Sequence, residues 1–90
     1  MRRRPKTDAN QPELVRAARR IGATVHVTAA LGCGFPDLVI GFRGETHLVE
    51  VKQRGEDLTD DEREFFAAWR GRPPEVARTL DELLRILGCL

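Results

Sequence analysis

The chain has 90 residues, of which 41% are hydrophobic and 32% are charged, a length and composition typical of one compact domain with a single core. Its formal net charge of +1 does not by itself indicate a nucleic-acid partner. No apolar run approaches the ~20 residues needed to cross a bilayer, and the basic start of the chain lacks the apolar stretch of a signal peptide, so we expect a cytoplasmic protein with no membrane association. Two cysteines and two histidines, far apart in the sequence, argue against a disulfide framework or a zinc site.

Residues 1–9 form a basic N-terminal arm that we expect to be flexible, ahead of a single domain over residues 10–90. The basic residues of the arm are Arg2, Arg3, Arg4 and Lys6. Such an arm can be a solvated tail, or it can bind the phosphate backbone of DNA by its charge. The sequence does not separate these two interpretations.

The first helix is expected to begin after Asn10 and to end at Gly22. Pro12 falls in the first turn, where proline is tolerated, and Asn10 with Glu13 has the spacing of a capping box. Apolar residues at helical spacing form one stripe: Leu14, Val15, Ala17, Ala18 and Ile21. Glu13 lies at the edge of this stripe, so it could reach a site at the rim of the sheet, or it could serve only in the capping box.

Three strands are expected next, over residues 24–28, 37–42 and 46–52. The first has β-branched alternation, and the second is short and apolar, which is typical of a buried strand. Between them, residues 31–35 contain two glycines and form a flexible connector. Residues 43–45 supply a tight turn, so the second and third strands should form an antiparallel hairpin.

A second helix, a fourth strand and a third helix complete the domain. Thr59 and Glu62 have the spacing of a capping box. The helix that they open carries Phe65, Phe66 and Trp69, which we expect in the core rather than stacked on DNA bases. Residues 75–78 should form a strand parallel to the third, reached by a right-handed crossover.

Thr79 is expected to cap the last helix, whose apolar residues face the core before Gly88: Leu80, Leu83, Leu84 and Leu87. The expected fold class is therefore α/β, with a mixed sheet flanked by helices and a C-terminal helix added after the last strand.

Two acidic residues are predicted to meet on the hairpin. The strand period of two places Leu48, Glu50 and Lys52 on one face, which by itself could be no more than a half-exposed polar face. Asp37, at the start of the partner strand, lies opposite Glu50, and opposed Cβ atoms are ~4.5 to 5.5 Å apart. Two carboxylates so placed repel by about 4 kcal/mol at an effective dielectric of ~20, so we expect a cation between them.

Lys52 can offset part of this repulsion, but a divalent cation does so better. Oxygen ligands with room for water suit Mg²⁺ or Mn²⁺, the ions that bridge to phosphate oxygens. Asp37 and Glu50 are the predicted ligands, the backbone carbonyl of Val51 could point toward the same ion, and Glu13 is a possible further ligand.

The segment Gly34-Phe35-Pro36-Asp37 followed by Glu50-Val51-Lys52 resembles the signature of the PD-(D/E)XK nuclease superfamily. The pattern Gly-x-Pro-Asp-Leu with Glu-Val-Lys, then Asp57-Leu58-Thr59 opening a helix and Trp69 near its end, is similar to the virus-type VRR-NUC branch. The resemblance covers nearly the whole chain, from about Asn10 to Gly88, and it depends on the order and spacing of motifs that are short when taken singly.

The resemblance implies a restriction-endonuclease-like αβββαβ core and DNA endonuclease activity that depends on Mg²⁺ or Mn²⁺. It implies that Asp37 and Glu50 bind the metal, that Lys52 orients or polarises the attacking water, and that Glu13 matches an acid on the first helix. One departure is Glu62, which stands where the family often has glutamine, so the role of this position is open. For a small stand-alone member the resemblance also implies a homodimer that acts on branched DNA such as four-way junctions, and the viral source that it suggests would place the protein in the host cytoplasm.

The leading hypothesis is thus a structure-selective or nicking endonuclease. The alternative is a non-catalytic nucleic-acid-binding or assembly module that keeps the nuclease fold. Candidate DNA contacts are Arg2, Arg3, Arg4, Lys6 and Gln53. A homodimer is also expected, because a chain this short buries only ~60 to 65% of its unfolded surface and because Ile86 and Leu90 widen the apolar face of the last helix.

Overall fold

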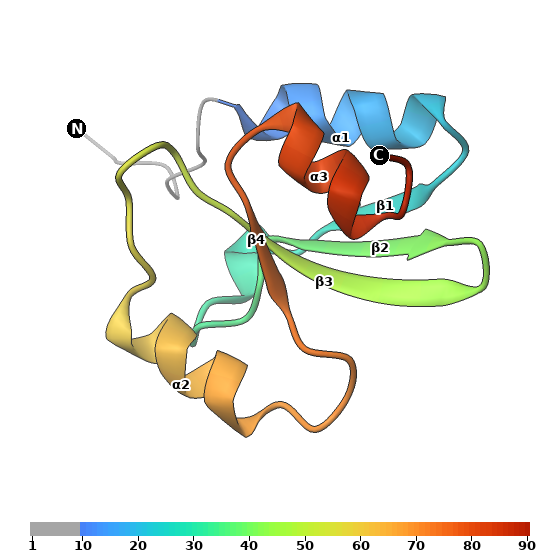
Figure 1. The fold of residues 1–90 in the computed structure, drawn as a ribbon. Coiled ribbons are helices and arrows are strands. Elements are labelled where there is room, and N and C mark those ends of the chain that lie inside the picture. Colours follow the sequence, from blue (N-terminus) through green and yellow to red (C-terminus); the bar gives the residue numbers. More distant parts are fainter. Residues whose placement is uncertain (1–9) are drawn as a thin grey trace.

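The computed structural model describes residues 10–90, so the candidate DNA contacts in the arm (Arg2, Arg3, Arg4 and Lys6) lie outside the described residues. The elements are α1 (Gln11–Arg20), β1 (Thr24–Val27), the short 3-10 helix η1 (Ala29–Leu31), β2 (Leu38–Phe42), β3 (Glu45–Val51), α2 (Asp60–Ala68), β4 (Glu75–Ala77) and α3 (Leu80–Ile86) (Figure 1). This is the predicted α/β fold, with αβββαβ order and a C-terminal helix. Within residues 10–90, no helix is long and apolar enough to span a membrane.

The four strands form one mixed sheet in the order β1-β2-β3-β4. β1 pairs antiparallel with β2 and β2 with β3, whereas β4 pairs parallel with β3. Arg43 and Gly44 form the turn between β2 and β3, and both have positive φ, at 53° and 80°, as a type I′ hairpin turn requires. The antiparallel hairpin and the parallel pairing after the crossover are therefore confirmed.

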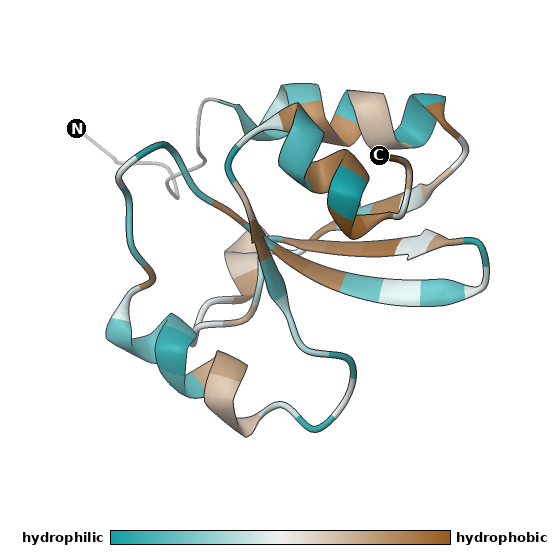
Figure 2. Ribbon diagram, in the orientation of Figure 1, coloured by the Kyte–Doolittle hydropathy of each residue, from teal (hydrophilic) through white to brown (hydrophobic). Residues whose placement is uncertain are grey.

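The core lies between the sheet and the two helices α1 and α3, which cover the same face (Figure 1). Figure 2 shows that β2 is mostly apolar and that β3 is apolar in the part next to β4 and hydrophilic near the turn. The central buried side chains are Leu14, Val15, Ala18, Val25, Leu38, Ile40, Val49, Val51, Ala77, Leu83 and Leu87. Ile21 departs from the predicted stripe: it is 40% exposed, because α1 ends at Arg20 and Ile21 is its C-cap.

Val49 and Val51 point into this core, so the alternation of β3 sends Leu48, Glu50 and Lys52 to the opposite face, as the sequence predicted. That face is not covered by α1 or α3. It is the side of the sheet on which α2 lies (Figure 1).

Helix α2 contains no buried residue. The expectation of a core position is wrong for Trp69, which is 42% exposed, and Phe65 and Phe66 are only half-buried. The reason is that α2 packs on a loop rather than on the apolar face of the sheet: the Phe65 ring meets Phe35 edge-on, with centroids 5.2 Å apart, and Trp69 stacks on Phe65 at 5.1 Å.

Asn10 does not cap α1, so the predicted capping box with Glu13 is wrong. Asn10 has helical backbone angles (φ −85°, ψ −9°), and its side chain makes no capping hydrogen bond. Its Nδ2 instead donates to the carbonyl oxygens of Lys52, at 3.3 Å, and Arg78, at 3.0 Å. These bonds fix the start of α1 at the end of the sheet where β3 and β4 finish.

Candidate functional site

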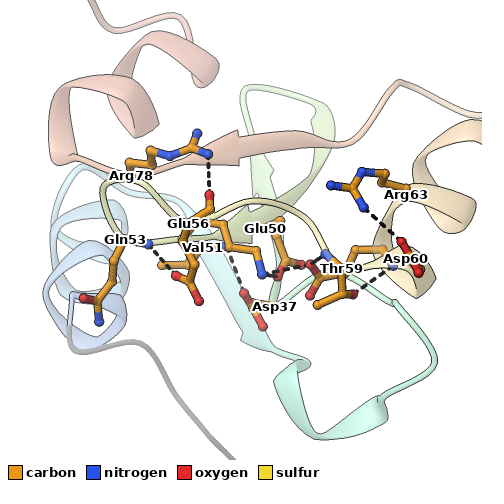
Figure 3. Close-up of polar contacts among 11 residues, drawn as sticks. Asp37, Glu50, Val51, Gln53, Glu56, Thr59, Asp60, Arg63 and Arg78 are labelled. Carbon is orange, nitrogen blue, oxygen red and sulfur yellow. Dashed lines mark hydrogen bonds and ion pairs between the residues drawn. The ribbon is translucent and has the colours of Figure 1, made fainter.

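Asp37 and Glu50 face each other at one end of the hairpin. The register of β2 and β3 pairs Leu38 with Val49, which makes Asp37 and Glu50 the next opposed positions, as predicted. The carboxylate Oδ2 of Asp37 accepts a hydrogen bond from the Val51 amide at 2.9 Å (Figure 3). The side chain of Asp37 is thereby held against the end of β3.

Glu50 is only 2% exposed although it carries a carboxyl group. Its Oε2 lies 3.6 Å from Nζ of Lys52, whereas its Oε1 is buried and has no hydrogen-bond partner within residues 10–90. Burial raises the pKa of Glu50 to about 9, with further contributions from the hydrogen bond to Glu62 and the charge of Asp37. Without a metal ion, Glu50 therefore keeps its proton at neutral pH.

Burial also raises the pKa of Asp37, although the hydrogen bond from the Val51 amide and the contact with Glu50 act in the opposite direction. The negative charge of either neighbouring carboxylate disfavours ionisation of the other. Without a metal ion, the pair of Asp37 and Glu50 therefore retains a proton at the position where a metal ion would bind.

Lys52 is 6% exposed and lies between two carboxyl groups. Its Nζ is 2.8 Å from Oε1 of Glu62, in addition to its contact with Glu50. Burial lowers the pKa of Lys52, but the hydrogen bond and charge of Glu62 outweigh burial, so the pKa is raised. Burial raises the pKa of Glu62, but the hydrogen bonds from Lys52 and the Thr59 amide outweigh it, so that pKa is lowered. Both groups are therefore charged at neutral pH.

Glu62 is the member of this cluster that the sequence did not assign to the site. The predicted capping box is confirmed: Oε1 of Glu62 accepts from the Thr59 amide at 2.8 Å, and the Thr59 hydroxyl accepts from the Glu62 amide at 3.2 Å. A capping box turns its carboxylate back toward the start of the helix. The loop that leads into α2 begins directly after Lys52. The capping-box spacing of Thr59 and Glu62 was therefore the feature of the sequence that could have predicted the ion pair between Glu62 and Lys52.

The close approach of Gly34 to α2 brings Glu62 to the end of β3. A Cβ on Gly34 would lie 2.3 Å from the carbonyl oxygen of Asp61, and Gly34 has a φ of +81°. Only glycine combines that backbone conformation with so close a contact. Gly34 and Pro36 are both buried, so the connector expected to be flexible is packed where it leads into Asp37.

Val51 and Gln53 flank the site on either side of Lys52. In an extended strand the N–H and C=O of one residue point to the same side. Because the Val51 amide donates to Asp37, the Val51 carbonyl also faces β2. This is the side on which the predicted ion would bind. Gln53 is exposed, and its amide donates to Oε1 of Glu56 at 2.8 Å; its contact with DNA stays a prediction.

Glu13 is not joined to this cluster. It is exposed on α1, and the described residues show no hydrogen bond or ion pair between Glu13 and either Asp37 or Glu50. Over the same part of the chain, no group of three or more His, Cys, Asp or Glu side chains has the arrangement of a metal site. A role for Glu13 as a ligand stays a prediction.

The donor set nevertheless fits a hard divalent cation. Two carboxylates and a backbone carbonyl are the oxygen ligands that Mg²⁺ and Mn²⁺ prefer, and Mg²⁺ usually binds one or two carboxylates and keeps several waters. The buried Oε1 of Glu50, which has no hydrogen-bond partner in the described part of the chain, is an acceptor that requires a proton or a cation. The cluster holds three carboxyl groups, of Asp37, Glu50 and Glu62, and one ammonium, so a cation would also balance the charge once all three are ionised.

Comparison of the chain with protein-family models, with curated proteins and with solved structures gave no match. The function is therefore argued from the geometry and charge of the site itself.

Proposed function

We propose that this protein is an Mg²⁺- or Mn²⁺-dependent endonuclease that hydrolyses phosphodiester bonds in DNA. The observation that carries the proposal is the meeting of Asp37 and Glu50 from neighbouring strands, beside Lys52, with one Glu50 oxygen buried and without a partner among residues 10–90. The same three residues carry the resemblance to the PD-(D/E)XK signature, which supports this assignment.

Asp37 and Glu50 would hold the ion, together with the carbonyl of Val51. The bound ion would neutralise charge on the scissile phosphate and lower the pKa of an attacking water. Lys52 supplies a fixed positive charge next to Glu50, and its ammonium can donate a hydrogen bond to the water or to a phosphate oxygen. Glu62 is a positioning residue, because it contacts Lys52 and completes the capping box of α2.

The direct test is cleavage of labelled duplex, nicked and four-way DNA in Mg²⁺ or Mn²⁺. We expect wild-type protein to cut at least one of these substrates, and Asp37→Asn and Lys52→Met to lose most of the rate. Removing one group of such a site lowers the rate by ~10²-fold or more. Asp81→Asn is the matched control, because Asp81 is an exposed carboxylate on α3 and should leave the rate unchanged.

Absence of cleavage on every substrate, or equal cleavage by wild type and Asp37→Asn, contradicts the nuclease assignment. Circular dichroism of each variant must accompany the assay, because Lys52 is buried among carboxyl groups and its removal can unfold the chain.

The alternative function is a non-catalytic nucleic-acid-binding module. It is favoured by the ion pair of Lys52 with Glu62, which balances the lysine charge without a ligand. This alternative predicts salt-dependent DNA binding that is unchanged by Asp37→Asn. It also predicts no binding of Mg²⁺ or Mn²⁺ by calorimetry.

A homodimer acting on branched DNA is part of the proposal. Leu90 is 64% exposed at the end of the chain after α3, and burial of such residues would add to a small core. A symmetric dimer would present two sites to the two equivalent strands of a four-way junction. Light scattering at micromolar concentration should give twice the monomer mass, and a monomer mass at all concentrations would remove this part of the proposal.

A further inference from the structure

A groove with a volume of about 440 Å³ lies beside the candidate site. The β3 strand and its turn line one side, through Gly44, Thr46 and Leu48, and the segment after α2 lines the other. A volume in this range is typical of small-molecule sites. The groove lies outside the cluster of charged residues, and the proposed cleavage chemistry does not use it.

The groove and the candidate site lie along the same face of β3. Thr46 and Leu48 lie on the same face of β3 as Glu50 and Lys52, because the alternation of the strand is regular from residue 46 to 51. Same-face neighbours on a strand are ~7 Å apart. Leu48, the lining residue nearest to Glu50 along β3, is therefore about one such step from Glu50, a separation that one extended nucleotide can span.

Trp69 gives the groove a fixed aromatic wall. Its indole stacks on the Phe65 ring, with an interplanar angle of 19°. Its Nε1 edge lies so close to Gly71 that a Cβ there would come within 2.7 Å. Trp69 still keeps 42% of its surface exposed. A large aromatic side chain that is fixed in place and open on one side is what base stacking requires.

Arg72 places a positive charge in the same groove. Its guanidinium is paired with the carboxylate of Glu45, and both side chains are about half exposed. An exposed ion pair contributes little to stability, so a phosphate can replace Glu45 at low cost. Guanidinium groups bind phosphate by two parallel hydrogen bonds. A cation beside an aromatic wall favours a nucleotide over an apolar peptide as the occupant.

We propose that the groove of Trp69 and Arg72 binds an unpaired nucleotide of a DNA strand, with its base on the Trp69 indole and its phosphate on Arg72. This inference rests on the proposed nuclease function, because the strand bound here is the strand whose neighbouring phosphate reaches Asp37 and Glu50. It defines the substrate class as DNA with an unpaired nucleotide next to the cleaved bond.

The chain provides its own reporter for the test. Trp69 is the single tryptophan, and there is no tyrosine, so the intrinsic emission comes from the groove. Wild-type protein in EDTA is titrated with a single-stranded ten-residue oligothymidylate and with an abasic oligomer of equal length and charge. We expect the oligothymidylate to quench the emission and to bind ~5- to 150-fold more tightly than the abasic oligomer, the range that base–aromatic stacking provides.

Substitutions then locate the effect. In fluorescence anisotropy with a labelled oligothymidylate, Trp69→Ala should lose the preference over the abasic oligomer, whereas Trp69→Phe should keep most of it. Ile21→Ala is the matched control, because Ile21 is an apolar residue at the end of α1 that is 40% exposed and does not line the groove. Equal binding of both oligomers by wild type, or an unchanged preference in a folded Trp69→Ala variant, overturns the proposal. If Trp69→Ala is unfolded, the comparison of the two oligomers by quenching of wild-type protein still tests the proposal.

The test separates this inference from the nuclease assignment. Quenching by the oligothymidylate that persists in Asp37→Asn supports the groove even if no substrate is cut. Conversely, the nucleotides next to the cleaved bond can be made abasic. If the protein then cuts DNA at the same rate, the result contradicts nucleotide binding in the groove but supports the nuclease assignment. An emission shift that follows protein concentration and is insensitive to oligonucleotide would show that a second copy of the chain fills the groove, and would also overturn the proposal.

Discussion

An ion pair of 2.8 Å joins Nζ of Lys52, at the end of β3, to Oε1 of Glu62, in the first turn of α2. The side chains are 7% and 16% exposed, so little water screens the pair. Because α2 has no buried residue, this link and the contacts of Gly34 and Phe65 determine where the helix lies. The same carboxylate thus anchors α2 and orients the proposed catalytic lysine.

We predict that Glu62→Gln destabilises the fold by about 1 to 3 kcal/mol, the range for removing one partner of a buried charged hydrogen bond. Glutamine can still complete the capping box, so the loss of stability measures the contribution of the ion pair with Lys52. Urea unfolding measures the difference. The control is Asp60→Asn, which removes a pair with Arg63 whose side chains are 98% and 54% exposed and should have no measurable effect. Equal stability of Glu62→Gln and Asp60→Asn would contradict this role of Glu62.

Glu62→Gln should also shift the pH dependence of cleavage. Glu62 helps to raise the pKa of Glu50 through a hydrogen bond and through its charge. Removing that charge lowers the pKa of Glu50, so Glu50 loses its proton at lower pH and can bind metal there. A rate–pH profile should therefore move toward lower pH in Glu62→Gln. A profile that moves toward higher pH would contradict this coupling.

Without metal, the fold should become less stable as pH rises. The pKa of Glu50 is raised from 4.5 to about 9, so between these values the folded state binds more protons than the unfolded state. The free energy of unfolding then falls with pH, by up to ~1.4 kcal/mol per unit. Urea unfolding in EDTA at pH 7, 8 and 9 should show this decline.

Glu50→Gln is the matched control for the pH series, since glutamine keeps the shape of the side chain but does not titrate. Its stability should change less between pH 7 and 9 than that of wild type. A wild-type stability that is constant or rises over this range would contradict a protonated Glu50.

Gly34→Ala should destabilise the fold by about 2 kcal/mol or more, because it adds a clash to a strained backbone. The new Cβ would lie 2.3 Å from the Asp61 carbonyl oxygen. Gly55→Ala is the control, because Gly55 has nearly the same φ, +80°, and no atom of residues 10–90 lies within 4 Å of its Cβ position. The difference between the two variants in thermal unfolding isolates the close contact, and equal losses would show that the packing of this loop on α2 is not tight.

The sheet and the acid pair could be predicted because both depend on local rules. A two-residue turn with Gly44 sets the hairpin register, and that register places Asp37 opposite Glu50. The alternation of β3 then directs Glu50 and Lys52 to one face. Each step uses only the period of a strand and the length of a turn.

The position of α2 could not be predicted in the same way. Its apolar residues have the pattern of a core helix, yet the helix packs on the loop before β2, so Trp69 is exposed and Glu62 reaches Lys52. That position depends on a contact between Gly34 and Asp61, which are far apart in the sequence. The bonds of Asn10 to Lys52 and Arg78 are equally non-local. Element patterns contain no information about such contacts.

Calorimetric titration of Mn²⁺ tests the central claim most directly, since the claim is that Asp37 and Glu50 hold a divalent cation where Glu50 otherwise keeps a proton. Measured at pH 7.5 in two buffers of different ionisation enthalpy, wild type should bind one or two ions and release about one proton, because ligands must be deprotonated. Asp81→Asn should behave as wild type, and Glu50→Gln should not bind. Absence of Mn²⁺ binding by folded wild type at millimolar concentration, or equal binding by Glu50→Gln, would contradict the account.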